Sequence, residues 1–332
     1  MSIKVGVIGA GAMGRNHARV YYEIPDVELV GVADIFAGNA NQTAQRYGGK
    51  SYTDYRQMLD EQRPQAVSVA VPTGDHLEVA LEIAQRGIHL LIEKPIAFNV
   101  TEARQIIQVC ADCGVVLTVG HVERFNPAVI ELKQRLLQGE LGRIFQVDAR
   151  RQSPFPARVR DVGVVIDLAV HDLDLMRYVT DAEYTRVFAE TQRQIHSTHE
   201  DLLTALFRMS NGAVGTLSVN WLTPTKVREM RVTGERGMFH VDYITQDLYF
   251  YENGTTAGEW DALRQLRGMS EGRMIRHVVN KREPLRAELE AFLRAVRGGP
   301  VTVTGEDGLK AVMLAQAVIQ SSMTQQVIKF ST

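Results

Sequence analysis

The chain is poor in cysteine, and this limits the metal and redox chemistry that it can support. Its 332 residues include two cysteines, Cys110 and Cys113. Two cysteines cannot form a four-cysteine zinc site within one chain, although the C-x-x-C spacing also occurs in redox pairs and in half-sites for metals. We interpret both as structural thiols, because a free cysteine usually behaves as a small buried hydrophobe. We expect no bound metal.

Excess charge and long apolar runs are also lacking. The net charge is −2, so the chain lacks the basic footprint of a nucleic-acid-binding protein. No apolar run approaches the ~20 residues that a membrane-spanning helix needs. Residues 1–5 lead directly into a predicted strand and leave no space for a signal peptide. We therefore expect a cytoplasmic protein with no nucleic-acid or membrane partner.

The remaining composition is that of a globular protein, with 45% hydrophobic and 23% charged residues. The length is enough for roughly two domains of ~150 residues each. In the first third, short apolar runs alternate with longer amphipathic ones, which predicts an α/β domain with a parallel sheet covered by helices. The predicted strands are residues 5–8, 29–33, 66–71, 89–92 and 115–119, and the predicted helices are residues 17–23, 40–47, 55–60, 77–86 and 101–113.

After Gly120 the pattern changes to alternating strands with few helices. Asn211-Gly212 lies between two strand-like runs and is a strong hairpin signal. We predict a domain of residues 1–120 and a second α/β domain of residues 121–332 with an antiparallel sheet, whose C-terminal helix packs back on the first. Its predicted strands are residues 144–150, 185–191, 202–209, 213–220, 229–233, 238–242 and 247–251, its predicted helices are residues 128–138, 165–179, 286–296 and 308–324, and residues 252–283 are predicted as a long loop.

A glycine-rich turn follows the first strand. Gly9-Ala10-Gly11-Ala12-Met13-Gly14 matches G-x-G-x-x-G, and its place between a strand and a helix is the context of a dinucleotide-binding Rossmann domain. The glycines allow close approach of a pyrophosphate, and the helix N-terminus supplies amide donors. We predict cofactor contacts at Gly9, Gly11, Ala12, Met13 and Gly14. The alternatives are FAD, S-adenosylmethionine or a turn with no ligand.

Two further segments of the first domain indicate which cofactor binds. Asp34 ends the second strand, where a carboxylate accepts hydrogen bonds from the ribose hydroxyls and repels a 2′-phosphate, so NAD is favoured over NADP. The loop from Val71 to His76 follows the third strand and is predicted to lie along the nicotinamide half, with contacts from Pro72, Thr73 and His76. The alternative role of His76 is to cap the next helix.

Glu93-Lys94-Pro95 ends an apolar strand. Ligands of open α/β sheets bind just beyond the carboxyl ends of the strands, so Lys94 stands where a ligand is expected. The alternative is an exposed ion pair in a loop, which is common and weak. We predict that Lys94 is catalytic and that Glu93 positions it or contacts the nicotinamide ribose. The isomer of Pro95 is not predictable from sequence.

A second constellation lies in the predicted helix after residue 162. Asp167, His171 and Asp174 are spaced i, i+4, i+7 in an otherwise apolar segment, which places them within about 60° of one another. A narrow polar stripe on an apolar helix indicates a lined cavity. Histidine exchanges protons near neutral pH, and a carboxylate one turn away orients it. The alternative is a buried, satisfied pair that holds the two domains together.

The stretch from Gly120 to Pro127 is dense in hydrogen-bonding groups at the predicted domain junction. Domain junctions are preferred ligand sites, and we predict substrate contacts from Arg124 and Asn126. Capping of a helix N-terminus explains Asn126-Pro127 equally well. It leaves His121 and Arg124 unexplained.

Together, the glycine turn, Glu93-Lys94-Pro95 and Asp167-x-x-x-His171 resemble the glucose–fructose oxidoreductase/inositol dehydrogenase (Gfo/Idh/MocA) family in order and spacing over essentially the whole chain. The resemblance implies a Rossmann domain, a C-terminal α/β domain with a large, mostly antiparallel sheet, and homodimers or homotetramers. It implies NAD-dependent oxidation of sugars, sugar nucleotides or cyclitols. It also implies that Lys94 is the catalytic lysine, His171 the acid/base and Asp167 its partner.

Within the family, residues 120–127 and 161–172 are similar to members that oxidise the C3 hydroxyl of UDP-N-acetylglucosamine ahead of an aminotransferase, for the 3-amino sugar of lipid A. A UDP-sugar needs cations for its diphosphate. The candidates, each of which is equally an ordinary surface residue, are Arg158, Arg160, Lys226 and Arg228 for the diphosphate and Trp221 and Tyr243 for stacking. The alternatives are an inositol or free-sugar dehydrogenase and a non-catalytic NAD-binding sensor.

Overall fold

A computed structural model describes residues 2–156, 162–254 and 271–330. The chain forms two compact units, which are described separately. Unit 1 comprises Met1–Phe125 and Glu283–Met313, and unit 2 comprises Asn126–Arg282 and Leu314–Thr332. The first boundary thus falls after Phe125 rather than at residue 120, and a later segment returns to the first unit.

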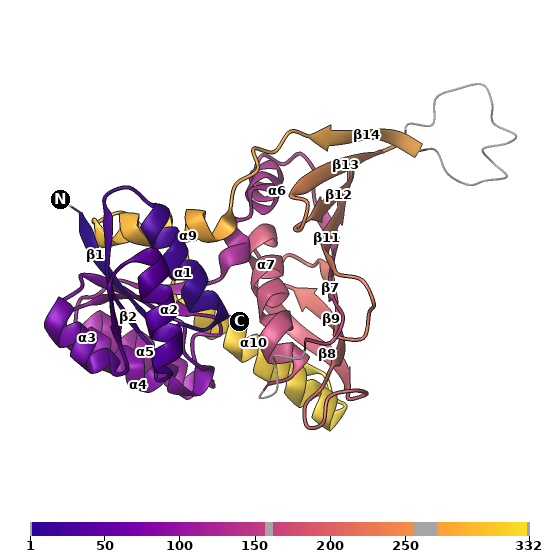
Figure 1. The fold of residues 1–332 in the computed structure, drawn as a ribbon. Helices are drawn as coiled ribbons and strands as arrows, with labels where there is room; N and C mark the ends of the chain where they lie inside the picture. The colour runs from indigo at the N-terminus through magenta and orange to yellow at the C-terminus, as the bar shows by residue number, and fades with distance from the viewer. Residues whose placement is uncertain (1, 157–161, 255–270, 331–332) are drawn as a thin grey trace, which may run out of the picture. The chain divides into compact units, whose positions relative to one another are not determined.

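Unit 1 is built on a parallel six-stranded sheet of order β3-β2-β1-β4-β5-β6 (Figure 1). Parallel strands need crossover helices, and the alternating pattern of the first third supplies them. The elements are β1 (Ile3–Ile8), α1 (Ala12–Glu23), β2 (Val27–Ala33), α2 (Ala37–Tyr47), β3 (Lys50–Tyr52), α3 (Tyr55–Gln62), β4 (Ala66–Val69), η1 (Thr73–Asp75), α4 (His76–Gln85), β5 (His89–Glu93), α5 (Val100–Asp112), β6 (Leu117–Gly120), η2 (Val122–Phe125) and α9 (Pro284–Val296).

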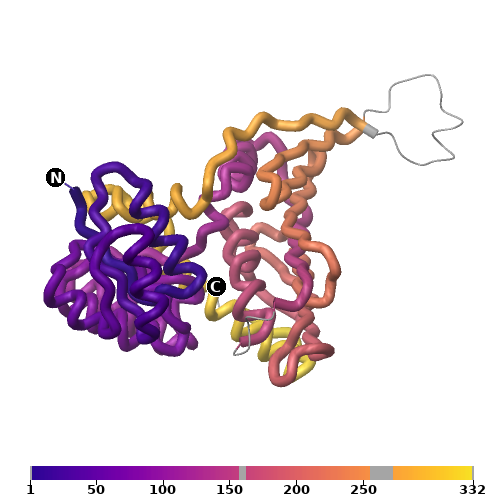
Figure 2. The backbone as a smooth tube through the Cα atoms, viewed as in Figure 1, coloured from indigo at the N-terminus to yellow at the C-terminus, as the bar shows by residue number. Residues whose placement is uncertain are grey.

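The two faces of this sheet have separate apolar cores. Along β5, Leu90 and Ile92 belong to one core and Leu91 to the other, as the two-residue period of a strand requires. The first core contains residues of α3, α4 and α5, and the second contains residues of α1, α2 and α9. Figure 2 shows α9 beside α1, far from it in sequence. Burial of its apolar side against α1 places α9 in unit 1.

Unit 2 is built on a nine-stranded sheet of order β14-β13-β12-β11-β7-β10-β9-β8-β15 (Figure 1). All of its strand pairs are antiparallel except β7 with β10. Its core joins the sheet to α6, α7 and the end of α10. The elements are α6 (Pro127–Leu137), β7 (Ile144–Gln152), η3 (Val165–Ala169), α7 (Val170–Thr180), β8 (Tyr184–Gln192), β9 (Leu202–Met209), β10 (Val214–Asn220), β11 (Val227–Gly234), β12 (Gly237–Asp242), β13 (Asp247–Asn253), β14 (Glu271–His277), α10 (Gly305–Thr324, of which residues 305–313 belong to unit 1) and β15 (Ile328–Lys329).

Two predictions for unit 2 are wrong in part. The predicted loop over residues 252–283 contains β14, which pairs with β13 and so satisfies its backbone groups on that side. Residues 255–270 of that loop lie outside the described ranges. The helix predicted over residues 165–179 begins with a π-helical turn, η3, before α7. Apolar spacing could not reveal this turn, because the segment is apolar on most sides.

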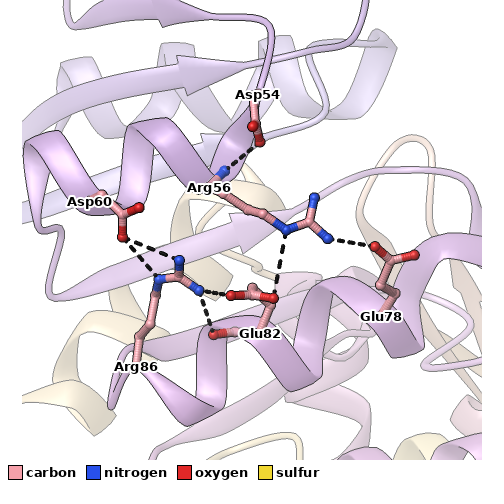
Figure 3. Close-up of polar contacts among 6 residues, drawn as sticks. All are labelled: Asp54, Arg56, Asp60, Glu78, Glu82 and Arg86. Atoms are coloured by element: carbon pink, nitrogen blue, oxygen red, sulfur yellow. Dashed lines mark hydrogen bonds and ion pairs between the residues drawn. The ribbon is translucent and has the colours of Figure 1, made fainter.

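A network of surface ion pairs tethers α3 to α4 in unit 1 (Figure 3). Arg56 Nη2 lies 2.6 Å from Glu78 Oε1, and Arg86 Nη2 lies 3.2 Å from Asp60 Oδ1 and also pairs with Glu82. Exposed pairs of this kind typically contribute about 0–1 kcal/mol each. The network therefore reinforces the packing of α3 against α4. Among the described residues, no helix is long and apolar enough to cross a membrane.

Candidate active site

The glycine turn between β1 and α1 has the geometry of a phosphate-binding loop. Gly9 has φ +87°, and a Cβ there would lie 2.5 Å from the Ala70 carbonyl oxygen. A Cβ at Gly14 would lie 1.7 Å from the Gly9 oxygen, whereas a Cβ at Gly11 would have no atom within 4 Å. Two glycines are therefore required by packing. The third, Gly11, opens onto space that a pyrophosphate can fill, so the turn fits the predicted dinucleotide.

The start of α1 provides the electrostatic part of this loop. Gly11 is the N-cap, and the first turn of α1, through Ala12 and Met13, carries no acidic side chain. The positive end of the helix dipole and the first amides thus favour an anion.

Asp34, at the end of β2, is tied to the same loop. Its Oδ2 accepts a hydrogen bond from the Ala10 amide at 2.7 Å, and its Oδ1 accepts one from the Phe36 amide at 2.8 Å. Two backbone donors thus fix the carboxylate beside the glycine turn. This is where the ribose of a dinucleotide is expected.

The loops after β4 and β5 are joined by His76. This side chain is 1% exposed, and its ring nitrogens lie 3.1 Å from the Val71 carbonyl oxygen and 3.0 Å from that of Pro95. Burial lowers the pKa of His76, hydrogen bonds to backbone carbonyl groups raise it, and the net pKa lies below its ordinary value. These contacts give His76 a structural role at the edge of the sheet where Pro72 and Thr73 also lie. Cofactor contacts from these three residues stay a prediction.

Glu93 and Lys94 occupy the carboxyl end of β5, and the Lys94–Pro95 peptide is cis. The Glu93 side chain is buried, with Oε1 2.8 Å from His17 Nε2 and Oε2 accepting from the Lys94 amide at 3.2 Å. Burial raises the pKa of Glu93, but His17 and Lys94 outweigh this, and the net pKa lies below its ordinary value. An ionised Glu93 therefore lies directly before half-buried Lys94.

Arg124 and Asn126 make contacts within their own units. Arg124 is 6% exposed, and its Nη2 lies 3.0 Å from Asp307 Oδ1 in unit 1. Asn126 caps α6 by accepting from the Ala128 amide at 3.1 Å, and its Nδ2 donates to the Tyr243 carbonyl at 2.9 Å. The capping alternative thus accounts for Asn126, while substrate contacts from either residue stay a prediction.

The second predicted constellation lies in unit 2. Asp167 is in η3 and His171 in the first turn of α7, and both are half-buried. Asp174 is 1% exposed, so it is part of the core and not of an open polar stripe. π-Helical turns occur frequently at functional sites. The alternative role for this His–Asp pair, holding the two domains together, stays open.

Two residues that support this helix were not predicted. Glu200 Oε1 accepts from the Val165 amide at 3.1 Å, at the start of η3. Arg151 Nε lies 2.5 Å from Asp172 Oδ2, and both side chains are buried. In the sequence, Arg151 lies near the end of a predicted strand and Asp172 directly follows His171. No short-range pattern in the sequence indicates that these two residues pair.

The predicted substrate residues of unit 2 have varied surroundings. Trp221 is 1% exposed and packs edge-on to Phe155 at a ring distance of 5.7 Å. Lys226 is exposed before β11, and Arg228 is half-buried on that strand. Arg158 and Arg160 lie outside the described residues. In the described ranges, no group of three or more His, Cys, Asp or Glu side chains is placed to hold a metal.

Comparisons with known proteins agree with this architecture. Residues 3–121 match the model of the oxidoreductase family with an NAD-binding Rossmann fold, and residues 129–240 match the GFO/IDH/MocA C-terminal domain. A UDP-N-acetylglucosamine 3-dehydrogenase of Acidithiobacillus ferrooxidans is 32% identical over 317 residues, covering 95% of this chain and 96% of that protein. A myo-inositol 2-dehydrogenase of Thermotoga maritima is 25% identical over 340 residues, covering 98% of each.

Solved structures extend the comparison to the fold. A structure of the Acidithiobacillus ferrooxidans enzyme superposes with a TM-score of 0.86 at 31% identity, covering 98% of each chain. A levoglucosan dehydrogenase in complex with NADH and levoglucosan has the same fold, with a TM-score of 0.87 at 21% identity. With the glycine turn, Asp34 and Lys94 at one edge of a Rossmann sheet, these matches establish that the chain belongs to the Gfo/Idh/MocA family and is an NAD-dependent dehydrogenase acting on CH–OH groups.

Proposed function

We propose that this dehydrogenase oxidises the C3 hydroxyl of UDP-N-acetylglucosamine to a ketone, upstream of an aminotransferase in the synthesis of the 3-amino sugar of lipid A. The observation that carries the proposal is the 32% identity, over 95% of the chain, to an enzyme of that name. The similarity of residues 120–127 and 161–172 to members of this group supports it further.

In the proposed mechanism, His171 accepts the proton of the substrate hydroxyl. Asp167 orients the imidazole and stabilises its charged form. Lys94 hydrogen-bonds the same oxygen and stabilises the negative charge that develops there. The chemistry that NAD would supply when bound is acceptance of the hydride from the carbinol carbon. Gly9, Gly11, Gly14 and Asp34 would hold the dinucleotide, and ionised Glu93 before Lys94 would position the lysine or contact the nicotinamide ribose.

Cationic side chains of unit 2 are proposed to bind the diphosphate. Lys226 is exposed and Arg228 half-buried at the start of β11. Both side chains therefore present positive charge. The guanidinium group of Arg228 also has the two-pronged geometry that matches phosphate oxygens. Arg158 and Arg160 complete the proposed set, and Trp221 and Tyr243 stay candidates for stacking on the uracil or the sugar.

The test is NADH formation, followed by absorbance, with UDP-N-acetylglucosamine, UDP-N-acetylglucosaminuronate, myo-inositol and glucose in parallel. The proposal expects the highest kcat/KM with UDP-N-acetylglucosamine and a 3-keto product by mass spectrometry. Replacing Arg228 with Ala should raise KM for the UDP-sugar more than it lowers kcat. Turnover of inositol without turnover of either UDP-sugar would refute the assignment.

Oxidation of an inositol is the second candidate. It is supported by the 25% identity, over 98% of the chain, to a myo-inositol 2-dehydrogenase. An inositol carries no diphosphate, so Arg228→Ala would then leave the kinetics almost unchanged. We further propose a homodimer or homotetramer, which light scattering after gel filtration would test; a monomer at micromolar concentration would contradict it.

A further inference from the structure

A buried chain of hydrogen bonds lies behind Glu93 in unit 1. His17 Nε2 is 2.8 Å from Glu93 Oε1, and His17 Nδ1 is 2.9 Å from Ser68 Oγ. Ser68 Oγ is in turn 2.8 Å from the Tyr21 hydroxyl. His17, Ser68 and Tyr21 are each 0% exposed. The Glu93 end of β5 is thus connected through α1 and β4 to the interior of unit 1.

The chemistry at one end of this chain fixes the direction of its first bond. Glu93 is an anion that only accepts, so His17 Nε2–H donates to it. His17 Nδ1 is bonded to the Ser68 hydroxyl, which is bonded in turn to the Tyr21 hydroxyl. The Glu93 carboxylate therefore terminates the chain, and the His17 donor fixes its Oε1.

A second acid, Glu288 of α9, is buried in the same interior and takes no part in this chain. It is 0% exposed, and neither of its carboxyl oxygens has a hydrogen-bond partner among the described residues. Its neighbours on α9, Leu285 and Leu289, belong to the apolar core that contains Tyr21. An ionised carboxylate in such surroundings is very costly, and two acids close together cannot both ionise.

We propose that His17 is a positioning residue for the Lys94 end of β5, because it fixes the Glu93 carboxylate, and that Glu288 is kept as a neutral carboxylic acid while the negative charge resides on Glu93. The effect on turnover rests on the proposed role of Lys94; the protonation state of Glu288 does not.

Two titratable groups interact with Glu288: Tyr21 of α1 and Glu93 of β5. The segment η2 also packs against α9 and carries Glu123 and Arg124. Arg124 is paired with Asp307. Burial, and then the charge of Glu93, raise the pKa of Glu288 well above its ordinary value.

The protonation of Glu288 should make the stability of the fold depend on pH in a defined direction. The unfolded chain has a glutamate pKa of ~4.3. Because the folded-state pKa of Glu288 is higher, Glu288 does not lower the free energy of unfolding at a pH below the unfolded-state pKa. It destabilises the fold increasingly as the pH rises toward the folded-state pKa. Glu288→Gln, a neutral isostere, removes this cost.

The first experiment measures thermal unfolding of wild type, Glu288→Gln and Glu290→Gln near pH 5 and near pH 8. Glu290 is the matched control on the same helix, where it pairs with Arg286. The difference in unfolding temperature between Glu288→Gln and wild type should become more positive from pH 5 to pH 8. The corresponding difference for Glu290→Gln should not. NAD affinity of Glu288→Gln, measured by calorimetry at neutral pH, should stay within about threefold of wild type. A loss of stability that grows with pH would show that Glu288 is ionised and paired, and would overturn the assignment.

The second experiment tests the positioning role through His17. His17→Ala should lower kcat and shift the pH profile with a smaller change in KM, and His17→Gln, whose amide can donate to Glu93 Oε1, should recover part of kcat. Wild-type kcat and pH profile in His17→Ala would overturn the role. If Glu288→Gln behaves as expected while no UDP-sugar is oxidised, the proposed substrate fails and the protonation of Glu288 stands.

Discussion

Asp34 Oδ2 accepts a hydrogen bond from the Ala10 amide at 2.7 Å, so the acid after β2 is part of the glycine turn itself. One carboxylate thus fixes the backbone of the glycine turn, and we expect it also to exclude a 2′-phosphate from the ribose position. On this hypothesis, cofactor choice and loop geometry depend on the same side chain.

Replacing Asp34 with Ala should weaken NAD binding. Removal of hydrogen bonds to a charged group costs about 1.5–3 kcal/mol, which corresponds to roughly a tenfold to hundredfold higher Kd. NADP should lose less affinity than NAD, because the repulsion is removed. Calorimetric titration with both cofactors measures this, with exposed Asp112→Ala as the control. Equal losses for both cofactors would contradict the proposed role in selectivity.

Lys94→Ala should separate binding from catalysis. We expect a fall of roughly 10²–10³-fold in kcat, the size associated with loss of one group that stabilises developing negative charge. NAD affinity should change little, because the glycine turn and Asp34 are intact. The matched control is Lys50→Ala in the same unit, an exposed lysine paired with Glu61. Wild-type turnover by the Lys94 variant would eliminate the mechanism.

The positions of the glycine turn, Asp34 and Lys94 at strand ends could be predicted from sequence, because they depend on short-range context. Each lies within or directly after a strand whose apolar pattern is clear. The His17–Glu93 bond joins residues 76 positions apart, and Glu288 comes from a helix that returns to unit 1 late in the chain. Such pairs depend on tertiary packing, which periodicity does not encode. The π-helical turn escaped prediction for a different reason, since an almost uniformly apolar segment fits both kinds of helix.

His171→Asn should lower kcat by roughly 10²–10⁴-fold, the contribution usual for a general base. Asparagine keeps a polar side chain of similar reach but cannot accept the proton. NAD affinity should be retained, because the dinucleotide residues lie in unit 1. His240→Asn, which alters a half-buried histidine paired with Glu229 on the sheet, is the control. Steady-state kinetics measure kcat of both variants. An unchanged kcat in His171→Asn would rule out His171 as the base.

The buried pair Arg151–Asp172 should be essential to the stability of unit 2. Arg151→Leu removes the cation beside a buried carboxylate and should cost about 3–5 kcal/mol in unfolding free energy. The double variant Arg151→Leu/Asp172→Leu should recover much of this loss, because no charge is then left unpaired. Denaturant titrations of both single variants and the double variant measure the coupling. If the loss of unfolding free energy in the double variant equals the sum of the losses in the two single variants, the two residues are not coupled.

The ion pair between Asp307 and Arg124 should make the stability of the fold decrease at acidic pH. Burial raises the pKa of Asp307, but Arg124 and the Thr304 hydrogen bonds outweigh this and lower it to about 2. A carboxyl whose folded-state pKa is depressed stabilises the fold above its unfolded-state value of ~3.9, and this stability is lost as the pH falls toward the folded-state value. Asp307→Asn should therefore reduce the unfolding free energy by about 2 kcal/mol at pH 7 and by much less near pH 2. Chemical denaturation at both pH values measures the difference, with exposed Asp112→Asn as the control. A loss that is the same at both pH values would show that Asp307 acts through packing and not through its charge.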